Sequence, residues 1–294
     1  MELIFDREYL KSLFVGDKEK RISRVEESLR RGHESLVSGQ ESNVKNLKHI
    51  FQSYKDETLI TLYTFAALHK SGNDGWNDIL TKCFPSESWN IENTNLMLEQ
   101  AISPSKKMQD RLRCQALSNP VKYLREQCSF EKTVEGKTNF DALLEINTDQ
   151  KVFFECKYTS DISYQTTYVT ERNQIARCIE VGLAAVDYNI ENFYFVLVTP
   201  KRYREYPGSR FYYFKMKQYQ TDPKALAMDL PTLTEWFGDK ECHDKLIKLM
   251  KHISWLTWED CFKTIQQMKH LTSLQFNSLQ AFYIDGNILP FSCS

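Results

Sequence analysis

The sequence predicts an α/β fold, and three stretches of the chain support this prediction. Residues 139–146 and 152–158 are apolar runs separated by a polar stretch, a pattern typical of a β-hairpin. Residues 170–186 carry apolar side chains at helical spacing, and residues 192–200 are almost continuously apolar, which indicates a helix followed by a strand buried on both sides. A strand, a helix and a strand in this order predict a crossover unit.

The N-terminal part of the chain is expected to be helical. Apolar residues recur at helical spacing in residues 22–29 and 44–54, and residues 59–68 are apolar enough to form a buried helix. We therefore predict a helical region over residues 1–95. It is either a cap on the rest of the protein or a separate recognition region.

Turn-forming residues divide the next part of the chain. Residues 71–75 and 83–88 are rich in Gly, Pro, Ser and Asn, and both are predicted to be loops. Ser103-Pro104-Ser105 is expected to begin the helix that leads into the core.

Beyond residue 221, the pattern predicts a loop around Pro223 and Pro231, a helix over residues 242–251 and a short strand over residues 252–258. A helix over residues 259–269 is expected to follow, entered through Thr257 or Trp258. The strand would extend one edge of the sheet. The core is therefore predicted to span residues 96–270, with residues 271–294 as a C-terminal extension.

The predicted hairpin carries three charged residues that we expect to meet. Glu155 and Lys157 lie two residues apart on one strand, so they share a face. A turn of about three residues would place Asp141 of the other strand opposite Glu155. Two carboxylates beside an ammonium group have the chemistry to bind a divalent metal and activate water against a phosphodiester.

The triplet has a plainer interpretation as well. Acid-x-Lys triplets also occur at residues 135–137, 149–151 and 222–224, all at predicted turns. On its own, therefore, the triplet at residues 155–157 would indicate an exposed ion pair at the end of a strand. Its position inside an apolar run favours a paired or functional role, because isolated charges are unfavourable there.

The helix after the hairpin places Gln174 and Arg177 side by side, with Thr170 as its expected N-cap. Gln174 would orient the nucleophile or contact the phosphate, and Arg177 would clamp the phosphate. The alternative is that both are ordinary solvated residues of a helix.

This arrangement resembles the PD-(D/E)xK nuclease superfamily, which has the restriction endonuclease-like fold: a helix, a three-stranded meander, a helix and a strand. The resemblance covers roughly residues 95–265 and is strongest over residues 139–200. It implies that Asp141 and Glu155 bind Mg²⁺ or Mn²⁺, that Lys157 orients the attacking water or stabilises the phosphate charge, and that Gln174 and Arg177 assist. Changing Asp141 or Lys157 to Ala is then expected to abolish cleavage and to leave folding intact.

The resemblance is closest to a bacterial branch with an Arg-Asn-Gln-x-x-Arg helix, here residues 172–177. One departure is Phe140, which stands where the family name places a proline that is not a metal ligand. A helix glutamate often completes the site in this family, and Glu99 and Glu126 are both candidates.

A basic stretch, which we expect to be a loop, follows the predicted strand at residues 192–200. Residues 201–217 carry six cations and one acid among aromatic residues, and we expect Lys201, Arg202 and Arg204, together with Arg172, to contact a nucleic acid. The alternative is a hairpin whose aromatic residues lie in the core. A second basic cluster is most simply a solvated helical face; it consists of Lys106, Lys107, Arg111, Arg113, Lys122 and Arg125.

Composition limits the classes of function. The 294 residues include 38 Lys and Arg against 39 Asp and Glu, so a nucleic acid must be bound through local patches. The eight cysteines form no Cys-x-x-Cys pair, which favours a reducing cytoplasm. No phosphate-binding Gly-rich loop, signal peptide or membrane-spanning run is recognised in the sequence.

Together these observations predict a Mg²⁺-dependent nuclease that acts on DNA in preference to RNA, with a homodimer as a plausible assembly. A catalytically silent nucleic-acid-binding module on the same fold is the alternative.

Overall fold

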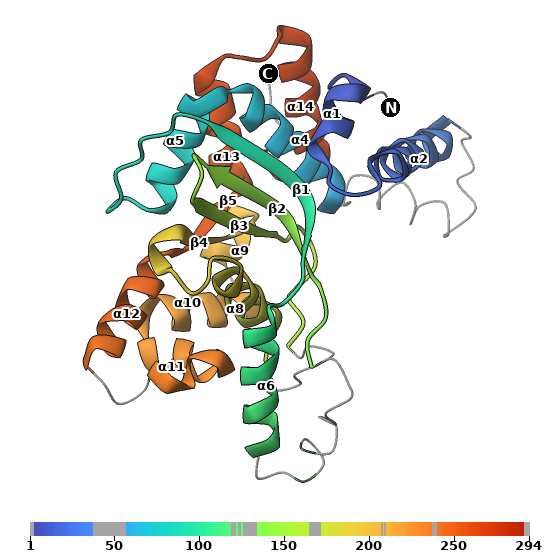
Figure 1. The fold of residues 1–294 in the computed structure, drawn as a ribbon. Helices are drawn as coiled ribbons and strands as arrows, with labels where there is room; N and C mark the ends of the chain where they lie inside the picture. The colour runs from blue at the N-terminus through green and yellow to red at the C-terminus, as the bar shows by residue number, and fades with distance from the viewer. Residues whose placement is uncertain are drawn as a thin grey trace.

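A five-stranded mixed sheet lies at the centre of the protein (Figure 1). The computed structural model describes residues 3–37, 57–118, 122, 125, 134–164, 172–206, 208, 210–236 and 240–290. The strands are β1 Thr94–Ile102, β2 Thr138–Ile146, β3 Gln150–Cys156, β4 Phe193–Thr199 and β5 Ile253–Thr257, arranged in sequence order across the sheet. The first three pair antiparallel, and β3, β4 and β5 pair parallel. The chain therefore has the α/β fold that its sequence predicts.

The predicted hairpin and crossover are both confirmed. Strands β2 and β3 pair with Ala142 opposite Phe154, and helix α8 Gln174–Ala185 connects β3 to the parallel strand β4. Helix α8 packs closely on the sheet at Gly182, where an added Cβ would lie 2.7 Å from the ring of Phe193. Every residue of β4 is buried, in agreement with its continuous apolar sequence.

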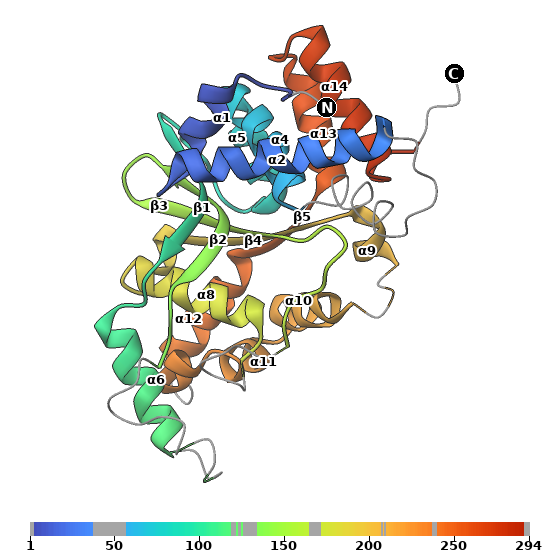
Figure 2. The ribbon, with the colours of Figure 1, turned by 90° about the vertical axis from the view of Figure 1, so that its right-hand side faces the viewer.

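Helices cover both faces of the sheet (Figure 1 and Figure 2). One face packs against α1 Arg7–Leu13, α2 Lys18–Val37, α4 Glu57–Lys70, α5 Gly72–Cys83, α13 Trp258–Met268 and α14 Ser273–Asp285. The other packs against α6 Lys106–Ser118, α8, α10 Phe211–Thr221, α11 Pro223–Met228 and α12 Lys240–Lys251. The short elements η1 Ile190–Asn192, α9 Lys201–Glu205 and η2 Pro231–Trp236 lie in the connections.

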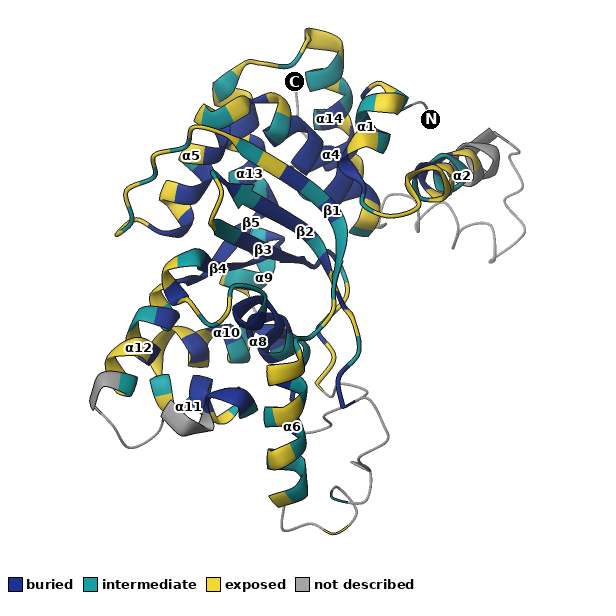
Figure 3. Cartoon of the chain, in the orientation of Figure 1, coloured by how far each residue is buried: buried dark blue, intermediate teal, exposed yellow. Residues whose placement is uncertain are grey.

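Side-chain alternation divides the sheet between two apolar cores. Ala142 and Leu144 belong to the core under α4, whereas Leu143 belongs to the core under α8, because successive residues of a strand face opposite ways. Figure 3 shows the inner strands β3 and β4 dark and buried, the edge strand β1 largely half-buried, and exposed residues on the outer faces of the helices.

The helical prediction for the N-terminal region holds for α2 and α4, while residues 44–54 lie outside the described part of the chain. These helices share one core with the C-terminal helices α13 and α14. A buried hydrogen bond joins Thr64 of α4 to Tyr283 of α14. Both ends of the chain therefore contribute to the layer that covers one face of the sheet.

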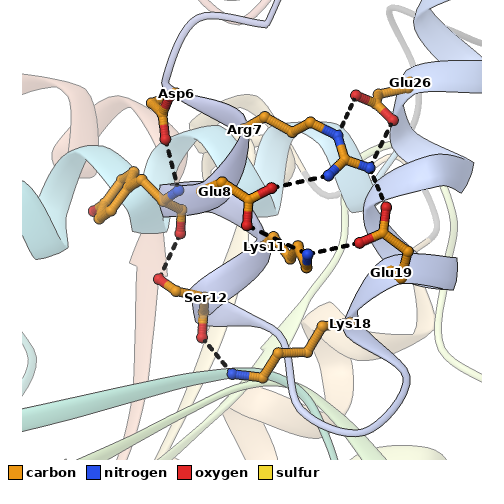
Figure 4. Close-up of polar contacts among 9 residues, drawn as sticks. Asp6, Arg7, Glu8, Lys11, Ser12, Lys18, Glu19 and Glu26 are labelled. Carbon is orange, nitrogen blue, oxygen red and sulfur yellow. Dashed lines mark hydrogen bonds and ion pairs between the residues drawn. The ribbon is translucent and has the colours of Figure 1, made fainter.

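An ion-pair network joins the first two helices (Figure 4). Arg7 of α1 pairs with Glu19 and with Glu26 of α2, the latter at 2.8 Å, and Lys11 lies 2.7 Å from Glu19. Hydrogen bonds from Arg7 and Lys11 lower the pKa of Glu19 to about 2. These contacts hold α2 against α1 at the edge of the helical layer.

Several local predictions are wrong. Helix α6, which begins after Ser103-Pro104-Ser105 as expected, lies between β1 and β2 instead of before the meander. Residues 72–75 belong to helix α5 and are not a loop. Pro223 begins helix α11 and Pro231 begins η2, because proline is compatible with the first turn of a helix.

The later elements agree better with the sequence. Helix α12, strand β5 and helix α13 lie where they were expected, with Thr257 as the N-cap of α13, and β5 forms one edge of the sheet. Among the helices described here, none has both the length and the apolar character needed to cross a bilayer.

Candidate active site

Glu155 and Lys157 lie where β3 ends. The Lys157 backbone N–H donates to Val198 O at 2.8 Å, which continues the pairing of β3 with β4 beyond the last strand residue. The two residues are only 2% and 7% exposed, and Lys157 Nζ lies 2.7 Å from Glu155 Oε1. The acid-x-Lys triplet is therefore a buried ion pair, not the exposed pair of the plainer interpretation.

Asp141 lies on β2 beside this pair. Extending the register by one residue from Ala142 and Phe154 places it opposite Glu155, as the hairpin geometry predicted. Its Oδ2 accepts the Cys156 N–H at 2.7 Å. Burial, and then the negative charge of Glu155, raise the pKa of Asp141 well above its usual range, so the two carboxylates are close enough to repel each other.

Gln174 reaches the same cluster from the first turn of α8. The N-cap of this helix is Asn173, whose side chain accepts the Ala176 N–H, whereas the expected cap Thr170 lies outside the described residues. Gln174 donates from Nε2 to Glu155 Oε1 at 2.6 Å, and its Oε1 accepts the Ser163 N–H at 3.1 Å. The side chain is thus held at both ends and fixes Glu155 relative to α8.

A carboxylate that the sequence did not single out joins the cluster. Glu57, the first residue of α4, lies 3.4 Å from Lys157 Nζ and accepts hydrogen bonds from Tyr158 N–H at 2.9 Å and from the Ser160 hydroxyl at 2.6 Å. Its one sequence signal is an acid at the start of the apolar run 59–68. That signal says nothing about which strand end the helix approaches.

Glu99, one of the two expected helix glutamates, does not take this place. Glu99 lies on β1, in a left-handed backbone conformation with φ of 52°, and pairs with Arg21. It borders, together with Asp141, a cavity of about 30 Å³ under α4, large enough for one water-sized species. Glu126 lies outside the described residues.

The charges around Lys157 keep it protonated. Burial alone would lower the pKa of its ammonium group, but Glu155, Glu57 and Asp141 together raise this pKa above its ordinary value. Lys157 therefore acts as a permanent cation near neutral pH and does not serve as a base.

Arg177 does not face this cluster. Its guanidinium donates to Glu135 at 2.8 and 3.0 Å and to Lys137 O at 3.2 Å. Arg172 pairs with Glu135 and with Glu180, and all three side chains are inaccessible to solvent. The expected contact of Arg172 with nucleic acid is wrong for this conformation, because its side chain does not reach the surface. The expected phosphate clamp also finds no support, since Arg177 is engaged elsewhere.

The basic stretch after β4 is helical, so neither the loop nor the hairpin expectation is correct. Lys201 pairs with Glu205, Arg202 donates to Asn287 O at 3.0 Å, and Arg204 donates to Trp255 O at 3.2 Å. All three side chains are partly exposed. Their contact with nucleic acid stays a prediction, with each cation already holding a protein partner.

The carboxylates have the donor chemistry of a metal centre but not a recognised ligand spacing. Within the described part of the chain, no group of three or more His, Cys, Asp or Glu side chains has the spacing of a metal site. The donor chemistry of Asp141 and Glu155 nevertheless suits Mg²⁺ or Mn²⁺, which prefer carboxylate oxygens. Burial, followed by the charge of Glu155, raises the pKa of Asp141, and a bound cation would favour its ionised form.

Comparisons with known proteins identify no relative. A scan against family models found no match, and neither the curated proteins nor the solved structures contain a match to the chain.

Proposed function

We propose that this protein is a metal-dependent nuclease with a restriction endonuclease-like core, acting on DNA in preference to RNA. One observation carries the proposal: a buried lysine and three carboxylates, contributed by β2, β3 and the first turn of α4, surround the end of one strand. Buried charges of this density are costly for folding. Perturbed ionisable groups gathered in this way are typical of functional sites.

Each residue has a proposed role. Asp141 and Glu155 would hold the metal, which supplies an activated water and charge neutralisation when bound. Lys157 stabilises negative charge on the phosphate as a fixed cation. Gln174 orients Glu155 through the 2.6 Å hydrogen bond from its amide, and Glu57 orients Lys157.

A specific observation favours a second candidate, the catalytically silent nucleic-acid-binding module. Glu155 Oε1 already accepts hydrogen bonds from Lys157 and Gln174, and its Oε2 accepts the Cys178 thiol at 3.5 Å. In that case the cluster is an internally satisfied polar network whose role is structural.

Cleavage assays with matched variants separate the two. We expect Asp141→Asn and Glu155→Gln to reduce Mg²⁺- or Mn²⁺-dependent cleavage of DNA by at least about a hundredfold. The control is Asp149→Asn, an exposed residue of the turn between the same two strands, which should retain full activity. Single-stranded DNA, duplex DNA and RNA are tested in parallel, with a chelator as the blank.

Two results would contradict the nuclease proposal. Cleavage by Asp141→Asn and Glu155→Gln at the wild-type rate would exclude these carboxylates from the reaction. Binding of nucleic acid without cleavage in either metal would support the silent module instead.

A further inference from the structure

A second concave site lies between helix α6 and η2, on the side of the sheet that α8 covers. It is a cavity of about 700 Å³ and shares no lining residue with the candidate active site. Its lining includes Lys106, Lys107, Asp110, Arg111, Gln115 and Thr232. Three cations of the basic cluster that the sequence presented as a solvated helical face, Lys106, Lys107 and Arg111, therefore border a hollow.

Positive charge dominates this cavity. Among the described residues, Lys106, Lys107 and Arg111 line it together with one acid, Asp110. Asp110 pairs at 3.1 Å with Arg113, which is not one of these lining residues. Lys107 Nζ and the guanidinium of Arg111 lie 5.4 and 4.9 Å from the ring centre of Tyr188. Two of the three cations therefore make cation-π contacts with the same aromatic ring at one wall of the cavity.

Polar groups in the lining point to a ligand as well. Thr232 is only 2% exposed, and its side chain lies within hydrogen-bonding reach of the Tyr188 hydroxyl at the same wall. The backbone of Thr232 is held in place, because its N–H donates to Glu180 of α8 at 2.6 Å. A threonine hydroxyl at the wall of a cavity can hydrogen-bond to a ligand there.

We propose that this cavity binds a phosphate-bearing anion. A multiply charged phosphate group would accept hydrogen bonds from Lys106, Lys107, Arg111 and the Thr232 hydroxyl, as charge-assisted phosphate sites do. The volume lies within the range of small-molecule sites, about 300–1,000 Å³. The ligand is either a free nucleotide or a phosphate of a nucleic-acid backbone, which present the same group. This site is additional to the proposed nuclease function and does not depend on it.

The test is direct binding of pyrophosphate to the full chain, measured by calorimetry at low ionic strength without divalent metal. We expect saturable binding whose Kd rises about tenfold or more in Lys106→Gln/Lys107→Gln, because charge-assisted hydrogen bonds are lost. Thr232→Val, which keeps the shape of the buried side chain, should raise the Kd about threefold. Lys248→Gln on α12, whose lysine pairs with Glu191 at the surface, is the matched control and should bind as the wild type does.

Competition identifies the source of the phosphate. Displacement of pyrophosphate by a nucleoside triphosphate but not by a DNA duplex supports a free nucleotide, and displacement by the duplex supports the backbone. The proposal is overturned if pyrophosphate shows no saturable binding, or if the double lysine variant binds as tightly as Lys248→Gln while its unfolding temperature equals that of the wild type.

Discussion

Replacing Lys157 with Met should strongly destabilise the fold. The side chains of Lys157 and Glu155 are 8% and 3% exposed and lie 2.7 Å apart, so loss of the ammonium group leaves Glu155 buried without its counter-charge. Breaking a buried ion pair in this way costs about 3–5 kcal/mol. The sequence alone led us to expect that a change at Lys157 leaves folding intact. The structure instead predicts that such a change lowers stability as well as any activity.

Urea unfolding followed by circular dichroism measures this effect. With a slope of about 3 kcal/mol per molar urea, a loss of about 3 kcal/mol lowers the midpoint by about 1 M. The matched control is Lys151→Met. Its lysine pairs with Glu145 across the same hairpin at 3.2 Å, but the two side chains are 29% and 32% exposed, so it should cost less than about 1 kcal/mol.

A double variant completes the cycle. Adding Glu155→Gln to Lys157→Met removes the buried carboxylate that has lost its counter-charge, and should restore part of the lost stability. This prediction is wrong if Lys157→Met lowers the unfolding free energy no more than Lys151→Met does, or if adding Glu155→Gln to Lys157→Met lowers it further.

Three further predictions follow from buried groups. Asp141→Asn should raise the unfolding free energy by about 1 kcal/mol without added metal, because the amide oxygen can still accept the Cys156 N–H and the charge that burial and Glu155 disfavour is gone. Since the folded pKa of Asp141 is raised, the wild type should gain stability from this group as pH falls from neutral, and the variant should not; equal pH profiles would contradict this. Gly182→Ala should lower the unfolding free energy by about 1–3 kcal/mol, because its Cβ would lie 2.7 Å from the ring of Phe193. An unchanged melting temperature would contradict this and would mean that α8 can shift to accommodate the methyl group. Burial lowers the pKa of His252 in the folded state, so the unfolded state binds a proton at this residue first as pH falls below about 6.5. The unfolding free energy of the wild type should therefore decrease below this pH, and that of His252→Gln should not show this decrease.

Much of the fold was predictable because apolar patterning reflects burial directly. The hairpin at residues 139–156, the crossover to β4 and the edge strand β5 all have periodicities that match their surroundings. Strand β1 was not predicted. Its residues are mostly half-buried at a sheet edge, and the helix α6 that follows separates β1 in sequence from its partner β2.

The candidate site was only partly predictable. Asp141, Glu155, Lys157 and Gln174 are brought together because neighbouring strands and the crossover helix constrain them through local geometry. The pairing of Arg172 and Arg177 with Glu135 was not predictable, because helix periodicity gives the face of a residue but not its partner, and Glu135 lies far away in the sequence.

By itself, the sequence determined which segments are strands and helices around the hairpin, and that an acid and a lysine share one face of β3. These properties follow from the period of the backbone, which is local. Tertiary structure alone decided that Glu57 lies beside Lys157, although the two are 100 residues apart in the chain. It also decided that Arg172 is buried in an ion-pair network and that Lys106, Lys107 and Arg111 of α6 border a cavity. Contacts of this kind depend on how the helical layers pack on the sheet. Apolar residues determine which faces pack together, and the sequence around the polar residues does not indicate which of them then come into contact.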